Sequence, residues 1–102
     1  MSFKRKLALN ISIIRTSNNL TQSEFANKIG VSPSIVSKME NAIHVPSAEI
    51  IRTICTAFDV DANWLMDLNS NTVLQEELID TFFKLSKDQQ QAILTLIRTI
   101  PK

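Results

Sequence analysis

The stretch "TQSEFANKIGVSPSIVSKMEN", residues 21–41, contains the only glycine of a chain of 102 residues. Thr21 and Glu24 have the spacing of a capping box, so a helix is predicted to start here. Gly30 can end that helix in the left-handed conformation. Ser32 is a candidate N-cap, and Pro33 suits the first position of a second helix. The stretch therefore predicts two short helices joined by a tight turn, which describes a helix-turn-helix.

Helical patterns also flank this stretch on both sides. Residues 3–17 carry apolar side chains at helical spacing, and a fourth helix is predicted after Pro46-Ser47. A short fifth helix follows Asp61, with Trp64 expected to anchor the core. Residues 69–72 are polar and are interpreted as a linker. Two further helices are predicted beyond it, the last starting with a capping box at residues 86–89.

The composition limits the fold and the cellular setting. One glycine and three prolines argue against a turn-rich all-β fold. No apolar run approaches the ~20 residues of a membrane span, and the amino-terminal apolar residues are too interrupted for a signal peptide, so a cytoplasmic location is expected. Cys55, the single cysteine, is expected in the core. The net charge of +1 does not by itself indicate a nucleic-acid partner.

The second helix of residues 21–41 has two distinct faces. At 100° per residue, Val36 and Met39 point to one side and are expected to pack inward. The opposite side carries short hydrogen-bonding groups and one cation, namely Ser34, Ser37, Lys38 and Asn41. Such a face can enter the major groove, where base edges offer donors and acceptors. The alternative at this point is an ordinary solvated helix face.

Several spaced features together resemble one family. They are Leu20-Thr21-Gln22, Phe25-Ala26, Ile29-Gly30-Val31-Ser32, Val36-Ser37, Met39-Glu40-Asn41 and Pro46-Ser47. Residues 20–47 look like the helix-turn-helix of the Cro/CI-type (XRE) regulators, which have the lambda-repressor-like fold. The resemblance extends over roughly residues 5–68. It implies an all-α fold with a five-helix DNA-binding domain over residues 1–68. The helical patterns beyond that domain predict a two-helix hairpin over residues 69–102.

The resemblance also implies roles for individual residues. Gln22 would hold a phosphate, Ser34, Ser37 and Lys38 would face base edges, and Asn41 and His44 would meet the sugar-phosphate backbone. Arg15 and Glu40 match a structural ion pair of the family. The full predicted DNA-binding set is Thr21, Gln22, Ser32, Pro33, Ser34, Ser37, Lys38, Asn41 and His44.

The chain departs from the family pattern in three places. Ala42 stands where glycine is usual, so Asn41 is expected to take the left-handed conformation instead. The following loop has His44 where basic residues are common. Pro33 and Ser34 replace long polar side chains, so contacts to thymine methyl groups from Ile35 or Pro33 are expected to matter more than arginine–guanine pairs.

The C-terminal helices are rich in large apolar residues. A helical pair that binds its twin would bury them and would bring two DNA-binding faces together. The expected dimerisation residues are Phe82, Phe83, Ile93, Leu96, Ile97 and Ile100. The alternative is that these helices fold back and enlarge the core of the monomer.

The sequence thus predicts a sequence-specific regulator that binds double-stranded DNA, most simply a repressor acting as a homodimer on a pseudo-palindromic operator. The alternative is an antitoxin-like interaction module whose C-terminal helices bind a partner protein. No catalytic constellation is visible, so an enzyme is not expected. Neither a cofactor, a metal, a membrane nor a small-molecule ligand is indicated.

Overall fold

The computed structural model describes residues 3–66 and 73–99, and within these ranges all regular structure is helical. This confirms the predicted all-α fold class. The elements are α1 (Phe3–Ser17), α2 (Gln22–Ile29), α3 (Pro33–Glu40), α4 (Ala48–Phe58), α5 (Ala62–Met66), α6 (Val73–Lys84) and α7 (Lys87–Thr99).

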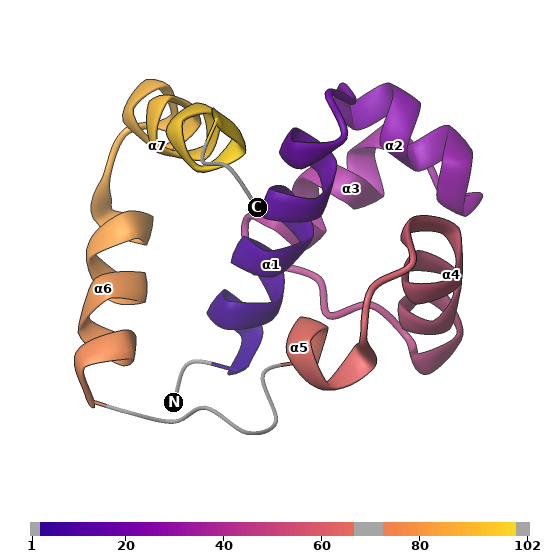
Figure 1. Ribbon diagram of the computed structural model, residues 1–102, viewed down its shortest axis with the longest axis horizontal. Helices are drawn as coiled ribbons and strands as arrows, with labels where there is room; N and C mark the ends of the chain where they lie inside the picture. Colours follow the sequence, from indigo (N-terminus) through magenta and orange to yellow (C-terminus); the bar gives the residue numbers. More distant parts are fainter. Residues whose placement is uncertain (1–2, 67–72, 100–102) are drawn as a thin grey trace.

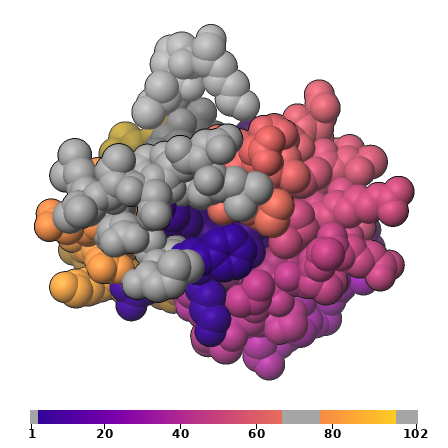
Figure 2. Space-filling model, turned by 90° about the horizontal axis from the view of Figure 1, so that it is seen from below, coloured from indigo at the N-terminus to yellow at the C-terminus, as the bar shows by residue number. Residues whose placement is uncertain are grey.

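Helix α1 is the centre of the molecule (Figure 1). Helices α3 and α5 pack against it on one side, and α2 packs on α3 and α4. Helices α6 and α7 pack against it on the other side. Seen from the end where α1 begins, the indigo start of α1 lies between the orange α6 on one side and the magenta-to-rose segment from the end of α3 through α4 on the other (Figure 2).

The turn between α2 and α3 forms for the local reasons that the sequence predicts. The Glu24 N–H donates to Thr21 Oγ1 at 3.0 Å, and the Thr21 N–H donates to Glu24 Oε1 at 2.8 Å, which completes the capping box. Gly30 has a left-handed φ of 76° at the end of α2. Ser32 then caps α3, because its Oγ accepts from the Ile35 N–H at 3.2 Å.

The end of α3 differs from the sequence-based expectation. Asn41 keeps a φ of −96°, and Ala42 takes the left-handed conformation with a φ of 59°. The backbone explains this choice, because the N–H groups of Ile43 and His44 both donate to the Lys38 carbonyl. That arrangement needs the left-handed residue one position after Asn41. The prediction for Asn41 was therefore wrong, and Ala42 carries the strain itself.

The main core joins the first five helices. The ring of the partly buried Phe58 stacks on that of the buried Phe25, with ring centroids 5.1 Å apart. The buried members are Leu7, Ile11, Ile14, Phe25, Ala26, Ile29, Val36, Met39, Ile54 and Leu65. Trp64, expected to anchor this core, is instead 44% exposed. Because α5 is a single short turn and Leu65 faces inward, the neighbouring side chain turns outward.

Cys55 packs at the edge of this core rather than deep inside it. Burial raises the pKa of its thiol, and the Asp61 carboxylate adds to the effect. The thiol therefore stays protonated and weakly nucleophilic at neutral pH.

The C-terminal helices pack on α1 rather than along one another. Phe82 of α6 and Leu94 of α7 are buried, outside the main core. Arg5 of α1 forms an ion pair with Asp80, and its guanidinium lies 5.8 Å from the centroid of the Phe83 ring. These contacts fix α6 to the first turns of α1. The two C-terminal helices thus extend the fold of the monomer.

This packing bears on the predicted dimerisation residues. Phe82 is buried within the chain itself, and Phe83 and Ile93 are half-buried. Leu96 is exposed, whereas the side chains of Ile97 and Ile100 lie outside the described residues. The expected boundary between residues 68 and 69 also lies outside them, so the division into two domains stays a prediction. Within the described ranges, no helix combines the length and apolar character needed to cross a membrane.

Replacing Ala42 with glycine is expected to stabilise the protein. A left-handed residue with a Cβ costs roughly 1–2 kcal/mol, whereas glycine adds about 0.4–1 kcal/mol of backbone entropy to the unfolded chain. The net gain in the free energy of unfolding is therefore on the order of 0.5–1 kcal/mol. Urea denaturation measures it, with Ala92→Gly, at an exposed position inside α7, as the matched control that loses stability. A destabilised Ala42→Gly variant would contradict the assigned conformation.

Candidate nucleic-acid interface

The outer face of α3 is uncovered by the described parts of the chain. Pro33, Ser34 and Lys38 are exposed, and Ser37 is half-buried. Val36 and Met39, on the inner face, are buried in the core. Of the side chains predicted to approach base edges, Ser34 and Lys38 thus lie on the free side of α3, and Ser37 lies at its edge toward α7. Ile35 is half-buried against the core, so Pro33 is the better placed of the two expected thymine contacts.

An ion pair fastens this helix to the rest of the domain. Arg15 Nε lies 2.6 Å from Glu40 Oε2, and Arg15 Nη2 lies 3.1 Å from Glu40 Oε1. The side chains are only 11% and 7% exposed. Arg15 Nη1 also donates to the Leu20 carbonyl at 3.0 Å. The pair implied by the family resemblance is present, and it connects α1, the α1–α2 loop and the last turn of α3.

Gln22, expected to hold a phosphate, is part of the same network. Its Nε2 donates to Glu40 Oε1 at 3.1 Å. Because an amide nitrogen carries two hydrogens, one remains for a ligand. Glu40 is therefore occupied by two donors, and its charge is directed inward rather than toward an approaching polyanion. Thr21, which precedes Gln22, is exposed and is engaged in the capping box.

The residues after α3 have structural partners as well as exposed groups. Asn41 Nδ2 donates to the Ser37 carbonyl at 2.7 Å, so this side chain closes the end of α3. His44 is exposed in the following loop, and Ser32 is exposed at the start of α3. Of the two residues predicted to meet the sugar-phosphate backbone beyond α3, His44 has the freer side chain.

Helix α7 borders this interface, which the sequence analysis did not foresee. A pocket of about 410 Å³ separates Ser37 of α3 and the C-cap residue Asn41 from Lys87 and Gln91 of α7. Ser12 and Thr16 of α1 share pockets with residues of α7. Both are buried, as is Ala8 one turn earlier, so a row of small side chains along α1 faces the C-terminal helices. The four-residue spacing of these three small side chains was the feature of the sequence that could have indicated helix packing on this side of α1.

Two capped helices about a glycine turn, the second with an uncovered polar face, define a helix-turn-helix protein. Residues 11–65 match the family model described as helix-turn-helix, which covers more than half of the chain. The chain therefore belongs to this family, of the XRE (Cro/CI-like) type, and this membership supports a DNA-binding role.

One curated relative is an antitoxin. The chain is 41% identical over 51 residues to "Antitoxin PezA" of Streptococcus pneumoniae serotype 4 (strain ATCC BAA-334 / TIGR4). The similarity covers 50% of this chain and 32% of the relative, so the chain spans about a third of that protein. No solved structure gives a significant match.

Removal of either partner of the Arg15–Glu40 pair is expected to be severe. The small contribution typical of exposed surface pairs does not apply here, because both side chains are largely buried. Arg15→Met or Glu40→Leu should each lower the free energy of unfolding by about 3–5 kcal/mol, since the remaining charge stays buried. The double variant should lose less than the two single losses combined, because no unpaired charge remains. Strict additivity in urea denaturation would contradict the coupling.

Proposed function

We propose that the protein is a sequence-specific regulator that binds double-stranded DNA and acts by binding rather than by catalysis. The observation that carries this proposal is the exposed outer face of α3, held in place by the buried Arg15–Glu40 pair. Family membership supports the same conclusion. The simplest action is repression, in which the bound protein excludes polymerase from a promoter.

The exposed side chains suggest how DNA would be read. Ser34 and Lys38 can donate to acceptors on base edges in the major groove, and Pro33 can contact a thymine methyl group. Thr21 and Gln22, at the start of α2, lie where backbone N–H groups favour a phosphate. Readout would then combine a small number of base contacts with phosphate contacts that set the register.

A homodimer would supply the affinity that one small face lacks. Specific complexes reach dissociation constants of roughly 10⁻⁸ to 10⁻¹¹ M, and dimers of this fold bind half-sites about 34 Å apart. Because Phe82 is committed to the monomer, Leu78 and Leu96 become the candidate contacts, at 63% and 66% exposed. They support a dimer on a pseudo-palindromic operator, formed by the outer surfaces of α6 and α7.

A second candidate function is that of an antitoxin-like module. The similarity to an antitoxin favours it, and the exposed Leu78 and Leu96 would then bind a partner protein. DNA binding would be secondary in that case. The two candidate functions differ in what covers the outer surface of α6 and α7. A second copy of the chain covers it in the homodimeric regulator, and a different protein covers it in the antitoxin-like module.

Selection from a random duplex pool, followed by light scattering, tests the proposal. Recovery of an inverted repeat, together with a dimeric mass at micromolar concentration, is the expected result. A chain that enriches no sequence would contradict the proposed function. A monodisperse monomer that still enriches a sequence would contradict the homodimer and favour the antitoxin-like candidate.

Lys38→Ala tests the recognition face directly. Loss of a base contact should weaken binding to the selected operator by ~1–3 kcal/mol and relax the preference at one position. Lys28→Ala, which removes another exposed lysine at the far end of α2, is the matched control. Fluorescence anisotropy with operator and scrambled duplexes measures both variants. Equal affinity of Lys38→Ala and the parent protein would remove Lys38 from the interface.

A further inference from the structure

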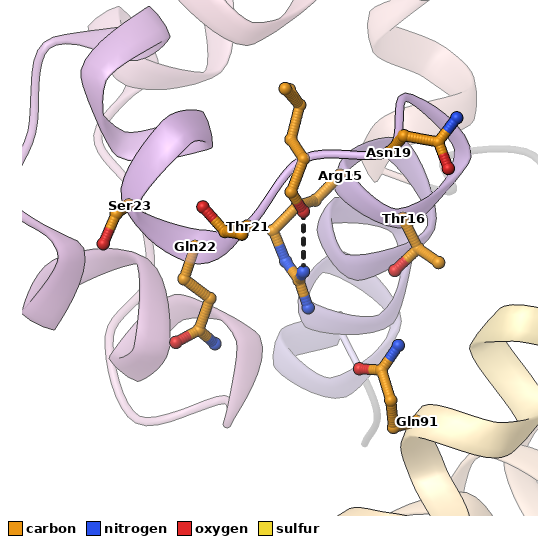
Figure 3. A pocket seen from close by; sticks show the side chains of 8 residues that line it. Arg15, Thr16, Asn19, Thr21, Gln22, Ser23 and Gln91 are labelled. Atoms are coloured by element: carbon orange, nitrogen blue, oxygen red, sulfur yellow. Dashed lines mark hydrogen bonds between the residues drawn. The ribbon is translucent and has the colours of Figure 1, made fainter.

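A second pocket lies between the start of α2 and the side of α7 (Figure 3). Its volume is about 500 Å³. Helix α1 supplies Arg15 and Thr16, the start of α2 supplies Gln22 and Ser23, and α7 supplies Gln91. Arg15, Thr16 and Gln91 face one another across the opening. The pocket thus joins the helix-turn-helix to a helix outside the family match.

Hydrogen-bond donors dominate the walls of this pocket. Arg15 carries five N–H groups, of which Nε, one on Nη1 and one on Nη2 are engaged, so one hydrogen on each terminal nitrogen remains. The first backbone N–H groups of the eight-residue α2 point out of the helix, and the helix dipole adds positive potential. Gln22 retains one amide hydrogen.

The buried hydroxyl of Thr16 is the independent observation that points to a ligand. Thr16 is 5% exposed, and its Oγ1 has no hydrogen-bond partner among the described residues. Its side chain is turned toward the space that Arg15 and Gln91 border. Buried polar groups without a partner are rare in folded proteins and often mark a missing water or ion.

Gln91 can complete the site from the opposite wall. Its side chain is exposed, and its Nε2 makes only a long contact of 3.5 Å to Thr95 Oγ1. The amide, which already points toward Thr16 and Arg15, is therefore weakly held and can reorient within the pocket. Among the lining side chains, all within the described ranges, none is a carboxylate. Two acids of the adjoining hydrogen-bond network are occupied, Glu40 by Arg15 and Gln22, and Glu24 by the Thr21 N–H. Asp88, one turn before Gln91 on α7, lines the neighbouring pocket instead.

We propose that this pocket binds a phosphate-type oxyanion, with Gln91 of α7 and Thr16 of α1 as ligands beside the N-terminus of α2. The phosphate belongs either to the backbone of bound DNA or to a free phosphate compound. The first source rests on the proposed function, whereas the pocket itself does not. In both cases α7 is a binding element and not only a structural or dimerising one.

Titration of the ¹⁵N-labelled full chain with inorganic phosphate tests the pocket by NMR, with sodium chloride at equal ionic strength as the reference. Saturable shifts are expected at the backbone amides of Gln22 and Ser23 and at the side-chain amide of Gln91. An absence of saturable shifts would overturn the proposal. Saturation at α2 with an unchanged Gln91 would also overturn it, because α7 would then play no part.

Substitutions separate binding from structure. Thr16→Val keeps the shape and removes a hydroxyl without a partner, so it should keep the thermal stability while it weakens phosphate binding several-fold. Thr53→Val on α4 is the matched control. Gln91→Glu should weaken binding by about tenfold through charge repulsion, and Gln91→Lys should strengthen it. Thr56→Lys, at an exposed position of α4, controls for the added charge. Unchanged affinity in both Thr16→Val and Gln91→Glu would refute the assignment.

Duplex DNA identifies the source of the phosphate. If phosphate competes with the selected operator, and if Gln91→Glu weakens both ligands equally, the source is the DNA backbone. If neither added phosphate nor the Gln91→Glu substitution affects operator binding, the source is a free phosphate compound. A chain that binds no duplex would refute the proposed function, and the phosphate titration would still decide on the pocket.

Discussion

The buried pair between Arg15 and Glu40 is the interaction on which the rest of the interface depends. It neutralises a carboxylate that would otherwise stand beside a polyanion, and it also fixes the last turn of α3 relative to α1. The same guanidinium holds the Leu20 carbonyl, and the same carboxylate holds Gln22. One ion pair therefore sets the orientation of both helices of the helix-turn-helix. A recognition surface of small side chains needs such rigidity, because short side chains make few contacts and these are lost when the helix is displaced.

Local chemistry explains what the sequence could predict. Capping residues act within one turn of a helix, so the starts of α2, α3 and α7 follow from Thr21, Ser32 and Ser86 without knowledge of the fold. The single glycine likewise marks its own left-handed position. The inward and outward faces of α3 follow from helical periodicity, since its inner residues meet the largest apolar cluster. The residues that make up the candidate site were therefore largely predictable from the sequence.

Features that depend on contacts between distant segments could not be predicted from the sequence. Ala42 is the left-handed residue after α3 because the N–H groups of the next two residues both donate to the Lys38 carbonyl. No side chain in the sequence indicates that backbone geometry. Trp64 turns outward because Leu65 occupies the inward position of a one-turn helix. The place of α7 depends on how its buried side chain Leu94 meets α1, which apolar spacing within α7 does not specify. The pocket between two distant segments was invisible for the same reason.

The row of small side chains on α1 has a consequence for how such a molecule can change. Ala8, Ser12 and Thr16 let the C-terminal helices approach α1 closely. The distance between the helix-turn-helix (α2 and α3) and the C-terminal helices (α6 and α7) is therefore set by the size of the side chains on α1, which lies between them. Added methylene groups at a single one of these positions would shift the tail outward as a unit. A substitution on α1 thus changes the placement of α6 and α7 while the outer face of α3 stays the same.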